Sequence, residues 1–272
     1  MELYDKIKET AAFIKSQINE LPTVGIVLGS GLGIMADSIE MQKEIPYKDI
    51  PHFPVSTVMG HKGTLAFGKI KGKNAIMMKG RFHYYEGYDM ETVTFPIRVM
   101  KELGVETLFI SNAAGGMNKQ FKVGDIMLID DHINLFPDHP LRGPSDERLG
   151  IRFPDMSEPY SVDLLKTAQQ AANNLGIKLH HGVYVGIQGP TFETRAEYRW
   201  LHIIGGDAVG MSTVPEVIVA IHSKMKVLAA SVITDLGILD VAVEVNHAEV
   251  LEAANIAAPK LASIFEAVID KL

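Results

Sequence analysis

The stretch Ile76-Met-Met-Lys-Gly-Arg-Phe-His-Tyr-Tyr-Glu-Gly-Tyr88 begins as an apolar run and ends in polar residues. The apolar half predicts a strand inside a sheet, with Arg81 and His83 just past its carboxyl end. Two residues apart on an extended backbone, their side chains point to the same face. A guanidinium beside an imidazole suits a phosphate or a carboxylate. The alternative is that Arg81 pairs with Glu86 or Asp89 at the surface and that His83 is an ordinary loop histidine.

Similar apolar runs recur on both sides of this stretch, at residues 23–28, 64–67, 74–78, 107–110, 125–129, 182–187, 208–211 and 227–233. Several are nearly continuous in β-branched residues, which is typical of strands buried on both faces. Helical patterns lie around and between them, at residues 3–19, 89–103, 160–175, 193–204, 213–224 and 246–271. This alternation predicts an α/β fold. Without a linker, a composition shift or a repeat, we expect one domain over residues 1–272.

Composition narrows the range of partners. Of the 272 residues, 47% are hydrophobic, and the formal net charge is -7, without long runs of like charge. This balance argues against nucleic-acid binding but leaves room for a small anion. The chain contains no cysteine, so disulfides and cysteine metal sites are excluded. The charged amphipathic start and the lack of an apolar stretch of about 20 residues predict neither a signal peptide nor a membrane span, so we expect a cytoplasmic protein.

Polar residues directly follow several of the predicted strands. They are Ser30, Arg81, Asn112, Glu193, Ser212 and Asp235. In α/β sheets ligands bind at the carboxyl ends of the strands, so these residues together predict a binding site. Simpler interpretations exist for individual residues: Glu193 could be the first-turn acid of a helix, and Ser212 a helix N-cap. His61, in the glycine-bracketed Met59-Gly-His-Lys-Gly63, is either a site residue or part of a surface turn.

The glycine-rich Gly29-Ser-Gly-Leu-Gly33 ends the first strand and has three possible interpretations. It is a plain tight turn, a turn whose amides and hydroxyl receive a phosphate, or a dinucleotide-binding turn. The dinucleotide interpretation fails on detail. Ile34 displaces the third glycine of that fingerprint, and Pro46, Pro51 and Pro54 interrupt the region where its second strand would run.

A metal site and a serine hydrolase are both disfavoured. Asp130, Asp131, His132, Asp138 and His139 supply ligand types, but their spacing matches no metal site. The chain has no Gly-x-Ser-x-Gly elbow. We therefore expect no bound metal and no serine nucleophile of that type.

Taken together, the motifs resemble those of trimeric-type purine nucleoside phosphorylases, the family that also contains the methylthioadenosine phosphorylases. They run in order through nearly the whole chain: Gly29-Ser-Gly-Leu-Gly33, Gly80-Arg-Phe-His-Tyr-Tyr-Glu-Gly-Tyr88, Asn112-Ala-Ala-Gly-Gly116, Pro140-Leu-Arg-Gly-Pro144, Gly189-Pro-Thr-Phe-Glu193 and Gly210-Met-Ser-Thr-Val-Pro-Glu216. The resemblance implies the nucleoside phosphorylase fold, a single α/β domain whose central mixed, partly barrel-like β-sheet is flanked by helices.

The resemblance also implies a reaction. The enzyme would be a pentosyltransferase of purine salvage, a glycosyltransferase of nucleoside metabolism. Inorganic phosphate, a co-substrate, attacks the anomeric carbon of a purine (deoxy)ribonucleoside and releases the free base and α-(deoxy)ribose 1-phosphate. No metal or organic cofactor is needed. The implied assembly is a homotrimer, in which Phe153 of Arg152-Phe-Pro154 closes a neighbouring subunit's pocket and gives the proline-rich stretch 134–159 a use.

Specific roles carry over by the same resemblance. The phosphate is held by Ser30, His61, Arg81, His83, the Ala113 amide and Ser212. The sugar is contacted by Tyr85, Met211 and His247, and the base by Phe192, Glu193, Val209, Gly210 and Asp235. The implied catalytic residues are His83, Glu193 and Asp235.

Asp235 departs from the commonest pattern of the family. Enzymes for 6-oxopurines usually carry asparagine there, whose amide both donates and accepts, whereas an ionised aspartate only accepts. Methylthioadenosine phosphorylases share the Thr-Asp pair, but lack Phe192 and Glu193 and continue with tyrosine and aspartate instead of Leu236 and Gly237. Because Glu193 can accept from N1–H, we expect inosine and guanosine to be favoured and Asp235 to be protonated during turnover. The alternative is an enzyme that prefers adenosine or methylthioadenosine.

Overall fold

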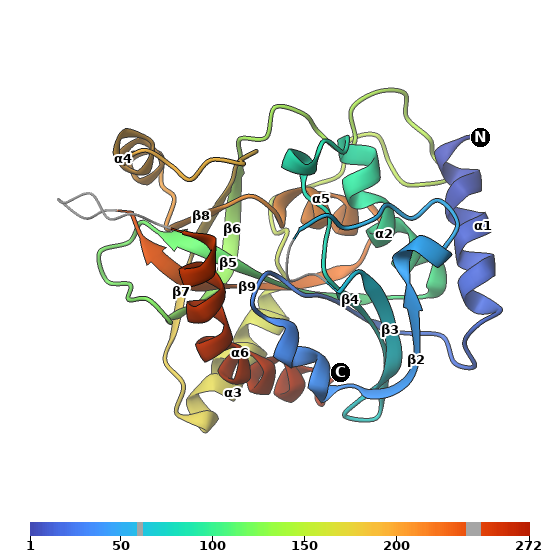
Figure 1. Cartoon of the computed structure of the whole chain (residues 1–272), viewed down its shortest axis with the longest axis horizontal. Coiled ribbons are helices and arrows are strands. Elements are labelled where there is room, and N and C mark those ends of the chain that lie inside the picture. Colours follow the sequence, from blue (N-terminus) through green and yellow to red (C-terminus); the bar gives the residue numbers. More distant parts are fainter. Residues whose placement is uncertain (59–61, 238–245) are drawn as a thin grey trace.

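A single mixed β-sheet forms the centre of the molecule (Figure 1). A computed structural model describes residues 1–58, 62–237 and 246–272. The strands in these residues are β1 (Val24–Val27), β2 (Glu40–Pro46), β3 (Thr64–Ile70), β4 (Lys73–Lys79), β5 (Thr107–Gly116), β6 (Ile126–Asn134), β7 (Leu179–Gly186), β8 (Ala208–Gly210) and β9 (Lys226–Leu236). Across the sheet they follow the order β2-β3-β4-β1-β5-β8-β7-β6-β9.

Half of this sheet closes on itself. β5 pairs with β8 on one side and with β9 on the other, and the chain of pairs β8–β7, β7–β6 and β6–β9 completes the circle. β5, β8, β7, β6 and β9 therefore form a closed barrel, from which β1 to β4 extend as an open sheet. Parallel and antiparallel pairs both occur. The predicted α/β fold with a mixed, partly barrel-like sheet is confirmed.

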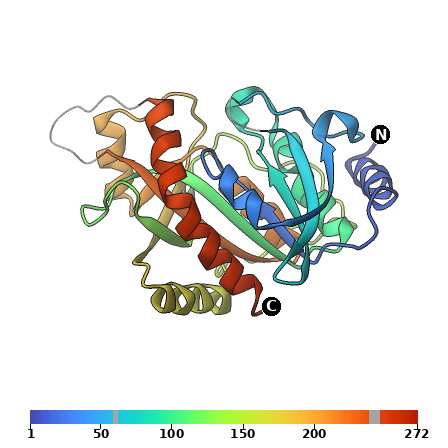
Figure 2. The same ribbon diagram turned by 60° about the horizontal axis from the view of Figure 1, so that its bottom comes forward.

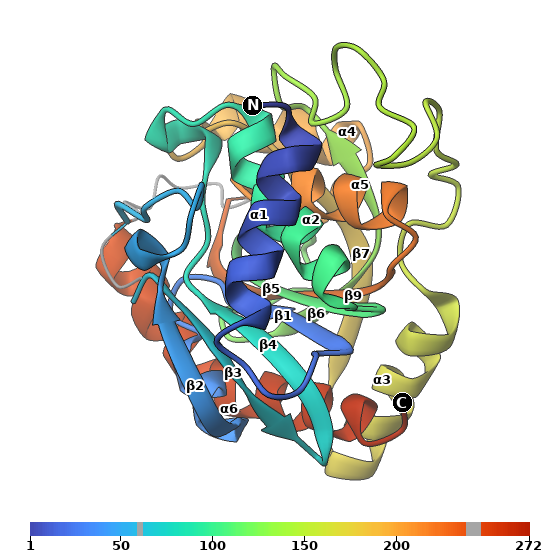
Figure 3. The same ribbon diagram turned by 90° about the vertical axis from the view of Figure 1, so that its right-hand side faces the viewer.

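Helices cover both faces of the sheet. They are α1 (Leu3–Lys15), α2 (Met90–Leu103), α3 (Val162–Leu175), α4 (Arg195–Ile203), α5 (Val214–His222) and α6 (His247–Ile269), with short 3-10 helices η1 (Gly33–Ser38), η2 (Tyr47–Asp49) and η3 (Tyr84–Glu86). α2 packs against α1 and α5 on one face, as Figure 3 shows. On the other face, α3 packs against α6, which runs diagonally across the sheet in Figure 2.

The double cover explains the continuous apolar runs of the sequence. In β4, Ile76 and Met78 pack into the cluster that includes α1, α2 and α5, whereas Ala75 and Met77 pack into the cluster that includes α3 and α6. Because successive side chains of a strand point to opposite faces, a strand buried on both sides shows no polar alternation. The same arrangement holds along β1 and β5, whose apolar residues divide between the two clusters.

One strand, β2, was not among the elements expected from the sequence. It pairs antiparallel with β3 at the edge of the open sheet, and most of its side chains are exposed. An exposed edge strand needs no apolar run, so periodicity gives little sign of it. Pro46 ends the strand, which is a position that proline tolerates at an edge.

The register of the parallel strands brings distant polar residues together. Val27 of β1 lies opposite Met78 of β4 and Ile110 of β5, so the residues that follow these strands leave the same edge of the sheet. The turn after β1 also lies against β5 at very close range. A Cβ atom built on Gly29 would lie 2.7 Å from both the Asn112 Cα and the Ser111 carbonyl oxygen. Only glycine allows this approach, which places Ser30 beside β5.

Candidate active site

Residues from across the chain line one cavity at these strand ends. The predicted residues among its lining are Ser30, Arg81, His83, Tyr85, Ala113, Phe192, Glu193, Val209, Gly210, Met211, Ser212, Asp235 and His247. They come from the ends of β1, β4, β8 and β9, from within β5, from η3 and the residue before it, from the segment between β7 and α4, and from the start of α6. The predicted site is therefore one continuous place in the structure.

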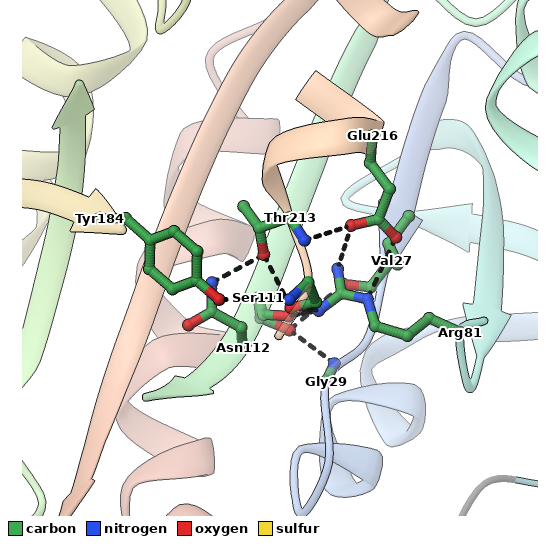
Figure 4. A network of polar contacts seen from close by, with 9 residues as sticks. Val27, Gly29, Arg81, Ser111, Asn112, Tyr184, Thr213 and Glu216 are labelled. Atoms are coloured by element: carbon green, nitrogen blue, oxygen red, sulfur yellow. Dashed lines mark hydrogen bonds and ion pairs between the residues drawn. The ribbon is translucent and has the colours of Figure 1, made fainter. Parts of the chain in front are cut away.

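Arg81 lies at the buried side of this cavity, with 1% of its surface exposed. Its Nε and Nη2 donate to the two carboxylate oxygens of Glu216 at 3.1 and 3.0 Å. Its Nη1 donates to the Ser111 carbonyl at 2.9 Å (Figure 4). The same Nη1 donates to the Ser212 hydroxyl at 3.1 Å. A bidentate carboxylate fixes both the position and the plane of the guanidinium.

The surface interpretation of Arg81 and His83 is wrong. Glu86 pairs with His83 instead, accepting from its backbone N–H at 2.8 Å and from its Nδ1 at 2.9 Å. Asp89 caps the first turn of α2. Burial opposes ionisation of Glu86, but hydrogen bonds from His83 and Thr57 outweigh it and lower the pKa of Glu86 to about 2. The ionised carboxylate therefore holds the His83 ring in one orientation.

The surroundings of His83 favour a ring without a positive charge. Burial is the main cause that lowers the pKa of His83; the hydrogen bond to Glu86 acts against this shift and the Arg81 charge adds to it, so the neutral ring is favoured at pH 7. A neutral imidazole that donates Nδ1–H to Glu86 carries its acceptor lone pair on Nε2. The guanidinium and the imidazole are thus one cation, paired with Glu216, and one ring that favours its neutral form.

Thr213 connects this region to α5 through an unusual backbone conformation. Its φ of 72° and ψ of -56° lie outside the regions that non-glycine residues prefer. The Thr213 N–H donates to Glu216 at 2.9 Å, and its hydroxyl accepts from the Asn112 side-chain amide at 2.8 Å (Figure 4). Thr213 is therefore the residue at the N-cap position of α5. The N-cap interpretation of Ser212 is wrong, and Ser212 lines the cavity instead.

A second group of polar residues lies at the end of β9. The Asp235 Oδ2 accepts from the Tyr198 hydroxyl at 2.8 Å, and Oδ1 from the Thr234 hydroxyl at 3.1 Å. The Glu193 side chain lines the same part of the cavity as Tyr198. Phe192, with 41% of its surface exposed, presents an aromatic ring at the same part of the lining.

Glu193 is not the first-turn acid of a helix. α4 begins at Arg195 with Thr194 as N-cap, and Glu197 completes its capping box. Burial raises the pKa of Glu193, and burial likewise raises the pKa of Asp235, although hydrogen bonds from Tyr198 act against both shifts. Each of these two carboxyls therefore keeps its proton to a higher pH than an ordinary carboxyl, and can donate a hydrogen when protonated or accept one when ionised.

The space between the two polar regions is lined by larger side chains. The Tyr85 ring stacks on His83, with ring centres 4.7 Å apart and planes 16° from parallel. Met211 and His247 complete this part of the lining, and His247 is the first residue of α6. The cavity therefore has one region around Arg81 that suits an anion and a second region around the carboxyls of Glu193 and Asp235. Tyr85, Met211 and His247 line the space between them.

Two of the predicted residues do not belong to this described lining. His61 lies outside the described residues. Phe153 is 83% exposed, away from the cavity, with the Arg152 guanidinium 5.6 Å from its ring centre. Within residues 1–58, 62–237 and 246–272, no group of three or more His, Asp or Glu side chains could hold a metal ion. In the same residues, no helix has both the length and the apolar character needed to cross a membrane.

Several residues that hydrogen-bond to the site residues and hold them in place were not predicted from the sequence. Glu216 lies inside one of the motifs but was given no role, and Glu86 was considered only as a surface partner of Arg81. Thr234 directly precedes Asp235 and was given no role either. Tyr198 gave no separate signal, because an aromatic three residues before Leu201 in a helical stretch is typical of a packed helix face. In the structure Tyr198 does pack against Leu201, but its hydroxyl points to Asp235.

Comparison with known proteins identifies the class to which this fold and cavity belong. The family model of the phosphorylase superfamily matches residues 23–270. Purine nucleoside phosphorylase 1 of Geobacillus stearothermophilus is 54% identical over 248 residues, covering 90% of both chains. Purine nucleoside phosphorylase of Bos taurus is 49% identical over 265 residues, covering 95% of this chain and 92% of the relative. The chain therefore belongs to the phosphorylase superfamily and, within it, to the purine nucleoside phosphorylase family.

Solved structures agree with this assignment. Schistosoma mansoni purine nucleoside phosphorylase in complex with inosine matches with a TM-score of 0.94 at 43% identity, covering 98% of this chain and 96% of that one. The same enzyme in complex with adenosine also matches with a TM-score of 0.94, at 44% identity, covering 98% and 97%. The alternative of a methylthioadenosine phosphorylase is not favoured by these comparisons.

Proposed function

We propose that this protein catalyses the phosphorolysis of purine ribonucleosides and deoxyribonucleosides, with inosine and guanosine as the favoured substrates. The observation that carries the proposal is the presence of Arg81 and the carboxyls of Glu193 and Asp235 in one cavity. Phosphate is a co-substrate, and the reaction needs no organic cofactor or metal. The proposal draws further support from the family relationship and from the inosine bound by the Schistosoma mansoni enzyme.

Phosphate would occupy the region beside Ser30, Arg81 and His83. The Arg81 guanidinium, the Ala113 amide and the Ser30 and Ser212 hydroxyls are donors suited to phosphate oxygens. A neutral His83 complements them, because its Nε2 can accept the hydrogen of a phosphate monoanion or dianion. Glu216 and Glu86 keep Arg81 and His83 in place, so the phosphate would meet oriented groups.

The purine would occupy the region beside Phe192, Glu193 and Asp235. A flat purine can stack on the Phe192 ring. As the glycosidic bond lengthens, positive charge builds on the sugar and negative charge on the purine. Phosphate stabilises the first charge, and a hydrogen donated at the N7/O6 edge stabilises the second. We assign that donation to protonated Asp235, while ionised Glu193 accepts from N1–H of hypoxanthine or guanine.

A substrate comparison tests this function. We expect the purified protein to release base from inosine and guanosine only when phosphate is present, with higher kcat/KM than for adenosine. Chromatographic measurement of free base from inosine, guanosine, adenosine and methylthioadenosine, with and without phosphate, gives the answer. Methylthioadenosine as the best substrate would overturn the preference. Nucleoside binding without phosphate-dependent release would indicate a non-catalytic binding protein.

We also propose that the protein acts as a homotrimer in which Phe153 closes the pocket of a neighbouring subunit. The Phe153 ring has 83% of its surface exposed, so it is available to a neighbouring subunit. Phe153→Ala should raise the KM for inosine several-fold, in line with the loss of a stacked aromatic contact. Phe192, the aromatic residue in the cavity of the same chain, is unchanged in this variant. Sedimentation equilibrium gives the mass of the assembly, and a monomeric, fully active wild type would contradict the proposal.

A further inference from the structure

Tyr198 occupies a central position in the purine region without a role in the function proposed above. Its ring is 5% exposed and packs among Met117, Val185, Leu201 and Val209. Only its hydroxyl reaches the polar part of the cavity, where it lies 2.8 Å from the Asp235 Oδ2. The Glu193 carboxyl belongs to the same lining, and hydrogen bonding from Tyr198 acts to lower its pKa. Tyr198 is thus the group that joins the two carboxyls.

The surrounding backbone leaves the Tyr198 hydroxyl little freedom to move. A Cβ atom on Gly115 would lie 2.5 Å from this hydroxyl and 3.1 Å from the Asp235 Oδ2, so the strand approaches both groups at a residue without a side chain. Gly237, which follows β9, leaves room for the Tyr198 ring in the same way. Packing of the ring from one side and glycine backbone from the other fixes the position of the hydroxyl.

A phenol hydroxyl has one hydrogen to donate and can accept another in return. Between two carboxyls, it therefore donates to the ionised one, and it accepts from the protonated one only until a bound purine takes that hydrogen. Burial raises the pKa of Tyr198, so the phenol keeps its hydrogen over the range in which the carboxyls titrate. The most favourable state of the three groups contains one protonated and one ionised carboxyl. If both carboxyls were ionised, they would compete for the single hydrogen of the Tyr198 hydroxyl.

We propose that Tyr198 is a positioning residue whose hydroxyl couples Glu193 to Asp235, so that together they hold one acidic hydrogen, carried by Asp235 when a 6-oxopurine nucleoside is bound. Glu193 is then ionised and accepts from N1–H, while the Asp235 hydrogen faces the N7/O6 edge. The inference rests on the proposed function, and it adds the residue that sets which carboxyl donates.

The resulting step balances. A phosphate oxygen forms the bond to the anomeric carbon as the bond from that carbon to N9 breaks, and its electron pair moves into the purine. The Asp235 hydrogen transfers to the purine at N7, which leaves the base neutral and Asp235 ionised. When the attacking phosphate is a dianion, the pentose 1-phosphate forms as a monoanion. It then loses a proton to become the dianion, and a proton returns to the carboxyl pair through solvent. No oxidant, metal or further reactant takes part.

Other charged groups face the pair from the surrounding elements. Glu197 in the first turn of α4 acts on Glu193 through its charge, and Asp235 raises the pKa of Glu193 in the same way. Arg81 and His83 after β4 and His247 at the start of α6 line the same cavity. Because these groups stay in place in a Tyr198 variant, a change in the titration of the pair reports on the hydroxyl itself.

Tyr198→Phe tests the proposal, since it removes the hydroxyl and keeps the ring. A hydrogen bond to the ionised form lowers the pKa of either carboxyl, so its loss should raise both pKa values by roughly one unit. We expect a bell-shaped profile of kcat/KM for inosine, whose acidic limb reports Glu193 and whose basic limb reports Asp235. Both limbs should move to higher pH by about one unit, with roughly tenfold lower kcat/KM on the acidic side. The KM for phosphate should not change.

The matched control is Tyr4→Phe, on α1 outside the cavity, which should leave the profile in place. A uniform loss of kcat/KM at every pH, or limbs that do not move in Tyr198→Phe, would show a purely structural role and overturn the proposal. Carbon-13 NMR of the wild-type carboxyls tests it without activity: one protonated and one ionised carboxyl at neutral pH is expected, and two ionised carboxyls would overturn it. Absence of phosphorolysis in the wild type would instead overturn the proposed function.

Discussion

Arg81→Ala should lose most of its affinity for phosphate and much of its stability. A guanidinium bound to an anion contributes about 1.5–3 kcal/mol per charge-assisted hydrogen bond, so the KM for phosphate should rise roughly 10- to 150-fold or more. The variant also leaves the buried Glu216 carboxylate without its bidentate partner, and removing one member of a buried pair costs about 3–5 kcal/mol. Steady-state kinetics at varied phosphate and urea unfolding measure the two effects. Base preference should change little.

A double variant separates these two consequences of Arg81. In Arg81→Ala with Glu216→Ala, no unpaired carboxylate remains, so the free energy of unfolding should recover part of its loss. The KM for phosphate should stay high, because the guanidinium is still absent. Exposed Arg142→Ala, in the long loop before α3, serves as the matched control for loss of an arginine. A folded double variant with the wild-type KM for phosphate would refute the phosphate role of Arg81.

Asp235→Ala should lower kcat for inosine by roughly 10²- to 10⁴-fold, the usual contribution of a general acid. The KM for phosphate should change little, because Asp235 lies at the other end of the cavity. Burial raises the pKa of Asp235, so its protonated form persists to higher pH than for an ordinary aspartate. Activity that depends on this form is present below the raised pKa and falls as the pH rises through it.

The pH dependence of an isosteric variant completes this test. Asp235→Asn carries an amide that donates at every pH, so the basic limb of the inosine profile should disappear. Asp130→Asn, an exposed carboxyl on β6, is the matched control and should keep that limb. A basic limb that persists in Asp235→Asn, or an unchanged kcat in Asp235→Ala, would show that Asp235 is not the acid.

Much of the fold and of the candidate site could be predicted from the sequence because the signals are local. Apolar runs such as Asn74 to Met78 identify buried strands without knowledge of their neighbours. Polar residues directly after those runs, such as Arg81 and Asp235, must lie at strand ends wherever the strands pack. The helical stripe that begins at Val250 was equally readable, and it forms α6. The exposed edge strand β2 lacked any such local pattern.

Local sequence patterns could not identify the hydrogen-bond partners of the site residues. Arg81 bonds to Glu216, 135 residues later in the chain, and Tyr198 bonds to Asp235, 37 residues later. The sequence suggested Glu86 or Asp89 for Arg81 because those carboxylates are near in the chain. The neutral state of His83 was equally hidden, since burial lowers its pKa and depends on everything packed around it.

The sequence by itself therefore determined the strands and the polar residues that end them, since both follow from the side chains of neighbouring positions. The tertiary structure decided how the sheet closes through β5 and β9 and which charges meet in the cavity. It also brought Glu193, Tyr198 and Asp235 together in one lining, with the Tyr198 hydroxyl bonded to Asp235. The physical reason is that burial and hydrogen bonding between distant segments arise only when the whole chain packs, and these set the ionisation of the groups that act on the substrate.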